Sequence, residues 1–584
     1  MHEERHRYDF CVVGGGMAGL IAALAAARRG VRVALVQDRP VLGGNASSEI
    51  RMHICGAHGA NLRETGLLEE LLLENHYYNA GVSYPLWDAV LFGAARMQPN
   101  LDLFLNCTVS QCEMEGLRIR AVRGWQLTTE TWHRIEATLF ADCSGDGILA
   151  PCSGADFRLG REARSEYGEG IAPEKADLAT MGMSCLFQPR EHPTPQPFIA
   201  LPWANRYTKP EDLRDRDWDL RRTNFWWIEV GGDHGDILHA TETCRDELLK
   251  IVFGIWDYIK NYAPEREQYA NWALDWVGFL PGKRESRRYL GDHVMTQRDI
   301  EAEGRFHDLV AYGGWSMDDH FPGGFHHPGA GTIFHPAPSP FGICYRSLYS
   351  RNIANLFCAG RCHSASHAAM SATRVMGTCS VMGQAVGTAA AIALRAGTGP
   401  RGAGESHLRA LQQALLDDDA YLPWQVRDVA PVSQDARLTA SVGDPEPLRN
   451  GMDRPLGAAD NGWRGPLGSA VTYELAAPAE LREARLVFDS DLDRTDPMTG
   501  NRALNQRHYE TKDAPLRPTP ATLVKAFRIE TQRADGMWQT AAEVAANHQR
   551  LVRVPLQVRT RGVRFTSLGT WGAPDAHLFA FEVR

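Results

Sequence analysis

A glycine motif close to the amino terminus constrains the fold of this 584-residue chain more than any other feature. Residues 8–13, YDFCVV, are typical of a short buried strand, and Gly14, Gly16 and Gly19 follow in the spacing G-x-G-x-x-G. The stretch LIAALAAARRG then predicts a helix that ends at Gly30, and VRVALVQ predicts a second strand. This order is the context that a dinucleotide site requires, so we expect an α/β domain of the Rossmann-like type.

Each position of the motif has its own predicted role. Gly14 permits the tight turn, Gly16 lets the backbone approach a pyrophosphate, and Gly19 allows the helix to pack closely on the strand. Met17 and Ala18 begin the helix, whose free N–H groups are expected to face the phosphates.

The end of the second strand departs from the usual pattern. Dinucleotide sites usually place an acid there to bind the adenosine ribose, whereas this chain has Gln37, with Asp38 one residue later. The Gln side chain can still bond a ribose hydroxyl, but it adds no charge that would exclude a 2′-phosphate.

A second glycine-rich segment follows this strand. Residues 39–49, RPVLGGNASSE, contain the doublet Gly43-Gly44 followed by Asn45. The segment resembles the two-dinucleotide-binding flavoproteins, in which a glycine-rich stretch after the second strand passes along FAD. The resemblance implies FAD as the cofactor.

Further motifs extend the resemblance to about residues 8–425. In chain order they are LGGNASSEIR, LRETGLLEELLLEN, WDAVLF, ADCSGDG, RLGREARSEYGE, LPGKRESRR, GGWSMDDH and AGRCHSASHAAMSATRVMGTCSVMGQAVGTAAA. Together they resemble the bacterial FAD-dependent oxidoreductase family, which is loosely related to the fumarate-reductase-type flavoproteins. The resemblance implies an FAD-dependent oxidoreductase, and it places Asp142 near the cofactor, with a structural turn as the alternative.

A late strand and helix are expected to complete the flavin site. Residues 354–362, ANLFCAGRC, read as a strand that ends in a glycine turn, and a helix rich in small residues begins at about Met376. In the related flavoproteins such a helix returns to the first domain, where its amino terminus stabilises negative charge on reduced flavin. The resemblance implies four residues around the flavin: Gly360, Arg361, Gly377 and, as the partner of its O2, Arg374.

Histidines supply the candidate catalytic base. His363 and His367 are four residues apart, hence on one face of a helix. A base that takes a hydroxyl proton, a hydrogen-bonded structural pair and a metal pair all remain open; we expect no metal, because the sequence places no third ligand nearby. Replacing either His by Asn is expected to abolish flavin reduction while FAD stays bound. For His53 we prefer packing or substrate contact to a covalent flavin bond.

Residues 171–344 are the predicted substrate domain. They hold eight of the fifteen tryptophans, whose faces could stack on sugar rings or simply pack in the core. Arg284 in LPGKRESRR is a candidate for holding a substrate oxygen, with a solvated charge run as the alternative. His320 in GGWSMDDH is a candidate for the active-site wall, with a metal as the less favoured alternative.

The chain changes character beyond about residue 430. Short strands separated by Gly, Pro and Asp predict an antiparallel sandwich that resembles the galactose-binding-like modules. Glycan binding, packing and dimerisation all remain open for it. We expect a discontinuous FAD-binding domain over 1–170 and 345–425, an inserted α+β substrate domain over 171–344 and an all-β module over 430–584.

Composition excludes several classes. With 71 acidic and 62 basic residues, the chain has no excess of positive charge that would favour nucleic-acid binding. It contains no run of 18 uncharged apolar residues, so we expect no membrane span. The twelve cysteines form no C-x-x-C pair, so we expect free thiols and a cytoplasmic protein.

The favoured function is dehydrogenation of a small polar substrate, such as the carbinol of a sugar or polyol, by hydride transfer to flavin N5. The alternatives are a flavin-dependent C–C desaturase or reductase, and a glycan-binding protein with a degenerate nucleotide fold. The electron acceptor and a homo-oligomeric state are left open.

Overall fold

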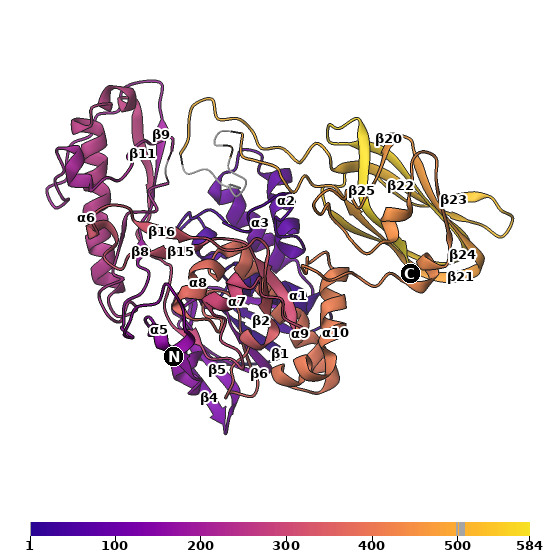
Figure 1. Cartoon of the computed structure of the whole chain (residues 1–584), viewed down its shortest axis with the longest axis horizontal. Coiled ribbons are helices and arrows are strands. Elements are labelled where there is room, and N and C mark those ends of the chain that lie inside the picture. Colours follow the sequence, from indigo (N-terminus) through magenta and orange to yellow (C-terminus); the bar gives the residue numbers. More distant parts are fainter. Residues whose placement is uncertain (1, 223, 498–499, 501–508) are drawn as a thin grey trace.

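The computed structural model describes residues 2–222, 224–497, 500 and 509–584 (Figure 1). Its central layer is a seven-stranded sheet built from β1 (His2–Val13), β2 (Val33–Val36), β3 (Leu101–Phe104), β4 (Cys107–Glu115), β5 (Arg118–Gln126), β6 (Thr131–Asp142) and β18 (Leu356–Cys358). The order is β3-β2-β1-β6-β5-β4, with β18 also paired to β6. Strands β1, β2, β3, β6 and β18 are parallel, whereas β4 and β5 are antiparallel additions at one edge.

Two helices of small residues pack against each other over this sheet. They are α1 (Met17–Ala27) and α9 (Met376–Ala396). A Cβ added at Gly383 would lie 2.1 Å from the carbonyl oxygen of Ala18, and one at Gly387 would lie 2.1 Å from that of Ala22. Glycine is therefore required at both positions for the two backbones to approach this closely.

Helix α9 also has the length and composition of a membrane-crossing helix. In this structure 94% of its apolar window is buried inside the protein, against α1 and the sheet, so it is a core helix here. The other helices of this half are α2 (Leu67–Tyr78), α3 (Tyr84–Arg96), α4 (Leu149–Ser153), α5 (Arg164–Tyr167), α7 (Gln297–Glu301), α8 (His367–Thr373) and α10 (Pro400–Asp417).

The inserted segment forms a second layer beside the nucleotide-type sheet, on the left in Figure 1. Trp227, Trp256 and Trp272 are buried in its own hydrophobic core, so core packing accounts for these three tryptophans. Its main elements are β8 (Met183–Ser184), β9 (Phe187–Glu191), β10 (Glu229–Val230), α6 (Thr241–Asp257), β11 (Trp272–Val277), β12 (Gly282–Lys283), β15 (Met317–His320) and β16 (Thr332–His335). Short pairs that join the layers are β7 (Phe157–Arg158) with β13 (Arg288–Tyr289), and β14 (Leu309–Gly313) with β17 (Phe341–Cys344).

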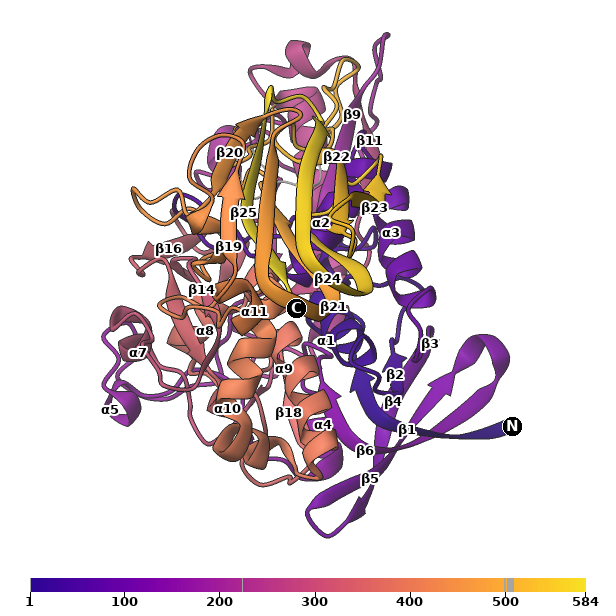
Figure 2. The ribbon, with the colours of Figure 1, turned by 90° about the vertical axis from the view of Figure 1, so that its right-hand side faces the viewer.

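The carboxyl-terminal part is an antiparallel β-sandwich (Figure 2). After α11 (Pro431–Gln434) come β19 (Arg437–Ala440), β20 (Trp463–Pro466), β21 (Ala470–Phe488), β22 (Val524–Gln532), β23 (Trp538–Val544), β24 (Leu551–Thr570) and β25 (Asp575–Val583). The first half of β21 pairs with β19 and its second half with β25, so this long strand passes from one layer to the other. The predicted combination of an α/β nucleotide-type fold, an insertion and an all-β sandwich is confirmed.

Buried ion pairs fasten the sandwich to the first half. The guanidinium of Arg494 makes two hydrogen bonds of 2.7 Å to Glu69 of α2, and Arg550 donates to Asp419 at 2.8 Å. One contact lies outside the sandwich core: Tyr509 packs into the hydrophobic core of the insertion. Tyr509, which lies between β21 and β22 in the sequence, therefore contacts the insertion, and the sequence did not predict this contact.

Candidate active site

Two adjoining cavities lie between the nucleotide-type sheet and the insertion. The smaller, of about 180 Å³, lies against the glycine turns, and the larger, of about 460 Å³, extends toward the insertion. The two cavities share six of their lining residues: Asn45, Ile50, Lys283, Arg361, Arg374 and Met376. Together they therefore form one continuous site.

The smaller cavity has the features of a pyrophosphate cradle. Gly14 has a φ of +101°, and a Cβ there would lie 2.4 Å from the backbone nitrogen of Ser144. A Cβ at Gly16 would project toward Gly44 with 3.8 Å to its Cα, so only glycine leaves the space between the two turns open. The amino terminus of α1 has no side-chain cap, which leaves its N–H groups for a ligand.

Most of the predicted nucleotide-binding residues line this cavity. They are Gly14, Gly16, Met17, Ala18, Gln37, Asp38, Gly43, Gly44, Asn45, Gly360, Arg361 and Arg374. Gly19 does not line it: a Cβ there would lie 1.8 Å from the carbonyl oxygen of Gly14, which is the packing role expected of this position.

Gln37 is held by the protein itself. Its Oε1 accepts a 2.7 Å hydrogen bond from the backbone N–H of Gly15, and its Nε2 donates to the carbonyl of Val41 at 3.2 Å. The side chain thus supports the glycine turn from the position where dinucleotide sites usually carry an acid.

Asp142 and Gly377 line neither cavity. The Asp142 carboxylate is buried and accepts hydrogen bonds from the backbone N–H of Leu149 and the hydroxyl of Tyr289, at 2.8 and 2.7 Å. The N–H of Gly377 donates to the carbonyl of Cys55 at 2.8 Å. Both residues hold together the segments that form the cavity wall.

A carboxylate that the sequence analysis did not single out lies at the junction of the cavities. Asp146 accepts from Lys283 Nζ and from Arg361, each at 2.8 Å. Burial opposes its ionisation, but the two cations outweigh that effect and hold the pKa of Asp146 well below its usual range. Asp146 is the last acidic residue of the motif ADCSGDG, so this motif could have indicated it from the sequence.

Arg374 and the amino terminus of α9 also face this junction. The guanidinium donates to the Asp318 carboxylate at 3.1 Å, and its buried Nε has no hydrogen-bond partner among the described residues. Helix α9 has no side-chain cap, and its first residue, Met376, lines both cavities. An unpaired donor and a helix terminus without a side-chain cap fit the anionic edge of a reduced flavin.

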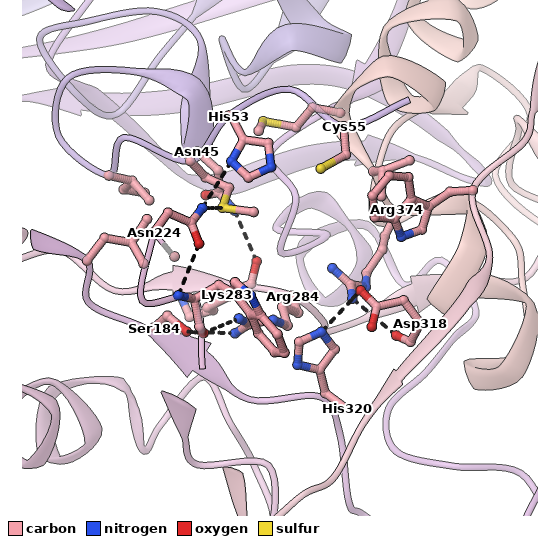
Figure 3. Close-up of a pocket in the computed structure, with 18 of the residues that line it drawn as sticks. Asn45, His53, Cys55, Ser184, Asn224, Lys283, Arg284, Asp318, His320 and Arg374 are labelled. Atoms are coloured by element: carbon pink, nitrogen blue, oxygen red, sulfur yellow. Dashed lines mark hydrogen bonds and ion pairs between the residues drawn. The ribbon is translucent and has the colours of Figure 1, made fainter. Parts of the chain in front are cut away.

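The larger cavity combines polar groups with aromatic faces (Figure 3). Arg284 is held by Ser184 Oγ at 2.9 Å and by the carbonyl of Trp226 at 2.8 Å. Trp226 and Trp315 are the two tryptophans of the predicted substrate domain that line this space.

His320 lines the larger cavity between two carboxylates. Its Nδ1 lies 2.6 Å from Glu229 and its Nε2 lies 3.2 Å from Asp318. Although burial opposes ionisation of Glu229, the charges of Arg284 and His320 outweigh it and lower its pKa. A carboxylate whose ionised form is favoured therefore lies at Nδ1 of the ring, an arrangement that orients a histidine for proton transfer.

Hydrogen bonds fix the tautomer of His53, which also lines the larger cavity. The Oδ1 of Asn224 accepts from the backbone N–H of Trp226 at 3.2 Å, so its Nδ2 is the group that lies 3.0 Å from His53 Nδ1. An amide NH₂ can only donate, so His53 Nδ1 accepts and the neutral ring carries its proton on Nε2.

The other two candidate bases, His363 and His367, do not line either cavity. His363 is fully buried, with its Nε2 2.8 Å from the hydroxyl of Thr373, and burial lowers its pKa to about 3. His367 lies between Glu285 at 2.8 Å and Asp319 at 3.1 Å; burial opposes its charge, but these carboxylates raise its pKa to about 10.

A buried ionic network explains three of the quoted motifs. Glu285 pairs with Arg288, and Arg288 donates to Glu162 at 2.7 Å. Glu162 in turn accepts from the backbone N–H of His367 at 2.9 Å. RLGRE, CHSASH and the second half of LPGKRESRR therefore meet behind the cavity wall, whereas Lys283 and Arg284 of the same motif line the cavity.

Comparison with known proteins agrees with this arrangement. The sequence model of the family "FAD dependent oxidoreductase" matches residues 9–415. Over 68 residues the chain is 40% identical to glycerol-3-phosphate dehydrogenase of Mycobacterium leprae (strain TN), and equally to glycerol-3-phosphate dehydrogenase 2 of Mycobacterium tuberculosis (strain ATCC 25618 / H37Rv). These matches span only 12% of this chain and 12% of the relatives.

Two solved structures are similar to parts of the chain. The family 32 carbohydrate-binding module of Streptococcus pneumoniae EndoD is 16% identical, with a TM-score of 0.20, over 26% of this chain and 97% of that one. L-proline dehydrogenase from P. horikoshii is 18% identical, with a TM-score of 0.17, over 25% of this chain and 24% of that one. The family match covers most of the chain, and the glycine cradle lies within it. The chain belongs to the FAD dependent oxidoreductase family, and its cofactor is FAD.

Proposed function

We propose that this oxidoreductase removes a hydride and a proton from a hydroxyl-bearing carbon of a small polar substrate, with sugars and polyols as the leading class. The observation that carries the proposal is the 460 Å³ cavity, which joins the nucleotide cradle and presents both polar groups and aromatic faces. FAD bound in the continuous site supplies the hydride acceptor.

His320 is the proposed proton acceptor. The residue lines the cavity, with its Nε2 3.2 Å from Asp318 and its Nδ1 2.6 Å from Glu229. In its neutral form the ring carries its proton on Nδ1 and donates it to Glu229, and a substrate hydroxyl that takes the place of the Asp318 carboxylate passes its proton to the free lone pair of Nε2. Glu229 then stabilises the imidazolium that forms.

Three further residues are proposed to position the substrate: Arg284, Trp226 and Trp315. Arg284, fixed by Ser184 and by the carbonyl of Trp226, offers its guanidinium to a second substrate oxygen. Trp226 and Trp315 offer faces on which a sugar ring could stack, since they line the same space.

A substrate screen tests this proposal. Purified protein is mixed anaerobically with sugars, polyols, hydroxy acids and saturated acids, and the flavin absorbance near about 450 nm is followed. Bleaching by a polyhydroxy compound, with a carbonyl product, is the expected result. Bleaching only by a saturated acid, with an alkene product, would overturn the proposal in favour of desaturation. A colourless protein that releases no FAD on denaturation would overturn it in favour of a binding protein.

A further inference from the structure

A cluster of metal-ligating side chains lies at the opposite end of the central sheet from the active site. His2, Glu4 and His6 alternate along β1 and therefore project from the same face of the strand. In the parallel pairing of β1 with β6, Glu4 stands opposite His133. Because a strand rises about 3.3 Å per residue, His6 is roughly 25 Å from Gly14 of the glycine cradle.

The ligand atoms have the spacing of a tetrahedral metal site. His6 Nε2 and His133 Nδ1 are 3.0 Å apart, and Glu4 Oε2 is 3.6 Å from the first and 3.7 Å from the second. Ligands bound to one tetrahedral zinc ion at about 2.0–2.1 Å lie about 3.3 Å from each other. The three observed separations bracket that value.

A neighbouring glutamine fixes the protonation of His133. Gln126 donates its Nε2 to the carbonyl of Leu105 at 2.7 Å, so its Oε1 is the atom that lies 3.2 Å from His133 Nε2. An amide oxygen only accepts, so the His133 proton is on Nε2 and the lone pair of Nδ1 points to His6. This is the outer contact that a metal-binding histidine commonly makes.

Packing also holds the two imidazole rings in place. Phe104 lies edge-on to both rings, with centroids 5.0 Å from His6 and 5.2 Å from His133. His133 is buried and His6 is half-buried, whereas the Glu4 side chain is 46% exposed. A fourth coordination position therefore opens toward solvent.

We propose that Glu4, His6 and His133 bind a divalent transition-metal ion, with Zn²⁺ as the preferred ion. Two imidazoles and one carboxylate suit zinc better than magnesium or calcium, which prefer oxygen ligands. The bound ion would link the amino-terminal end of β1 to β6.

Zinc titration of untagged, chelator-treated protein tests this site. We expect one Zn²⁺ per chain by calorimetry, and at least about a tenfold loss of affinity in Glu4→Gln and in His133→Ala. Glu4 is exposed, so Glu4→Gln keeps the test valid even if His133→Ala fails to fold. His239→Ala, which removes a histidine that is 86% exposed, is the matched control and should bind zinc like the wild type.

X-ray absorption of the zinc-loaded protein provides an independent measurement. Scattering from two imidazole rings is expected in the wild type and from fewer than two in His133→Ala. Absence of zinc binding by the wild type, or unchanged affinity in both Glu4→Gln and His133→Ala, would overturn the proposal.

Discussion

At the residue scale, two histidines four positions apart have opposite protonation states. His363 is buried against the hydroxyl of Thr373, and burial lowers its pKa to about 3, whereas two carboxylates raise the pKa of His367 to about 10. Unfolding returns both to an ordinary histidine pKa of about 6.5. Their contributions to stability therefore change with pH in opposite directions.

For His367 the stabilisation is complete below about pH 6.5 and is lost as the pH rises toward 10. We expect His367→Gln to cost about 1.5–3 kcal/mol at pH 6, because it removes the cation shared by Asp319 and Glu285, of which Glu285 keeps Arg288, and less at pH 9. Chemical unfolding of both proteins at the two pH values measures the difference. A gap that widens at pH 9 would be inconsistent with a charged, paired His367.

For His363 the dependence is reversed. The neutral ring is favoured above about pH 6.5, and the wild type loses stability as the pH falls toward 3, because only the unfolded chain takes up the proton. His363→Gln removes that loss, so the wild type should become less stable relative to the variant between pH 6.5 and pH 5. If the free energies of unfolding of the wild type and of His363→Gln changed in parallel between pH 6.5 and pH 5, His363 would not be neutral in the folded protein.

Site residues whose role depends on local structure could be predicted from the sequence, whereas residues that come together from distant segments could not. The glycines of the two turns could be predicted, because the spacing of a strand, a turn and a helix fixes their backbone requirements. Asn224, Trp226 and Glu229 lie in or just before the short strand β10 of the insertion. The fold of the insertion brings Glu229 beside His320, and packing against the first half brings Asn224 beside His53. No local pattern marks such residues.

At the element scale, the contact between α1 and α9 holds the flavin site in shape. Both helix amino termini face the continuous cavity, and the backbones touch at Gly383 and Gly387. The sequence predicted both helices, because their composition and flanking strands are local signals. It did not predict which side of the sheet the insertion would cover.

Replacing Gly383 by Ala should separate these helices. The added Cβ would meet the Ala18 carbonyl oxygen at 2.1 Å, so we expect a loss of about 1–3 kcal/mol in the free energy of unfolding and weaker FAD retention. Gly93→Ala in α3 is the matched control: its Cβ meets nothing within 4 Å, and it should be neutral or stabilise by up to about 1 kcal/mol. Equal stability of the two variants would show that the close helix contact is not required.

At the scale of the whole molecule, the sandwich is fastened to the flavoprotein half through buried charges. Glu69 of α2 is buried, and Arg494 and Ser490 satisfy its carboxylate. All twelve cysteines are free and lie in the first half, so no disulfide assists this attachment. The compositional change near residue 430 predicted a separate β module, but the charged interface was not visible in the sequence.

Removing one partner of this interface should be costly. We expect Arg494→Met to reduce the free energy of unfolding by about 3–5 kcal/mol, because it leaves the Glu69 charge buried and unpaired. Adding Glu69→Gln should recover part of that loss. Calorimetric unfolding of the single and double variants measures both effects, and a double variant less stable than Arg494→Met would argue against an uncompensated charge.

The central claim is that the cavity around His320 carries out substrate oxidation. Its most direct test is the anaerobic rate of flavin reduction by the substrate from the screen, in His320→Asn and in His326→Asn, which alters an exposed histidine outside the cavity. We expect a rate about 10²–10⁴-fold lower in His320→Asn with unchanged FAD content, and a wild-type rate in His326→Asn. A wild-type rate in His320→Asn would contradict it.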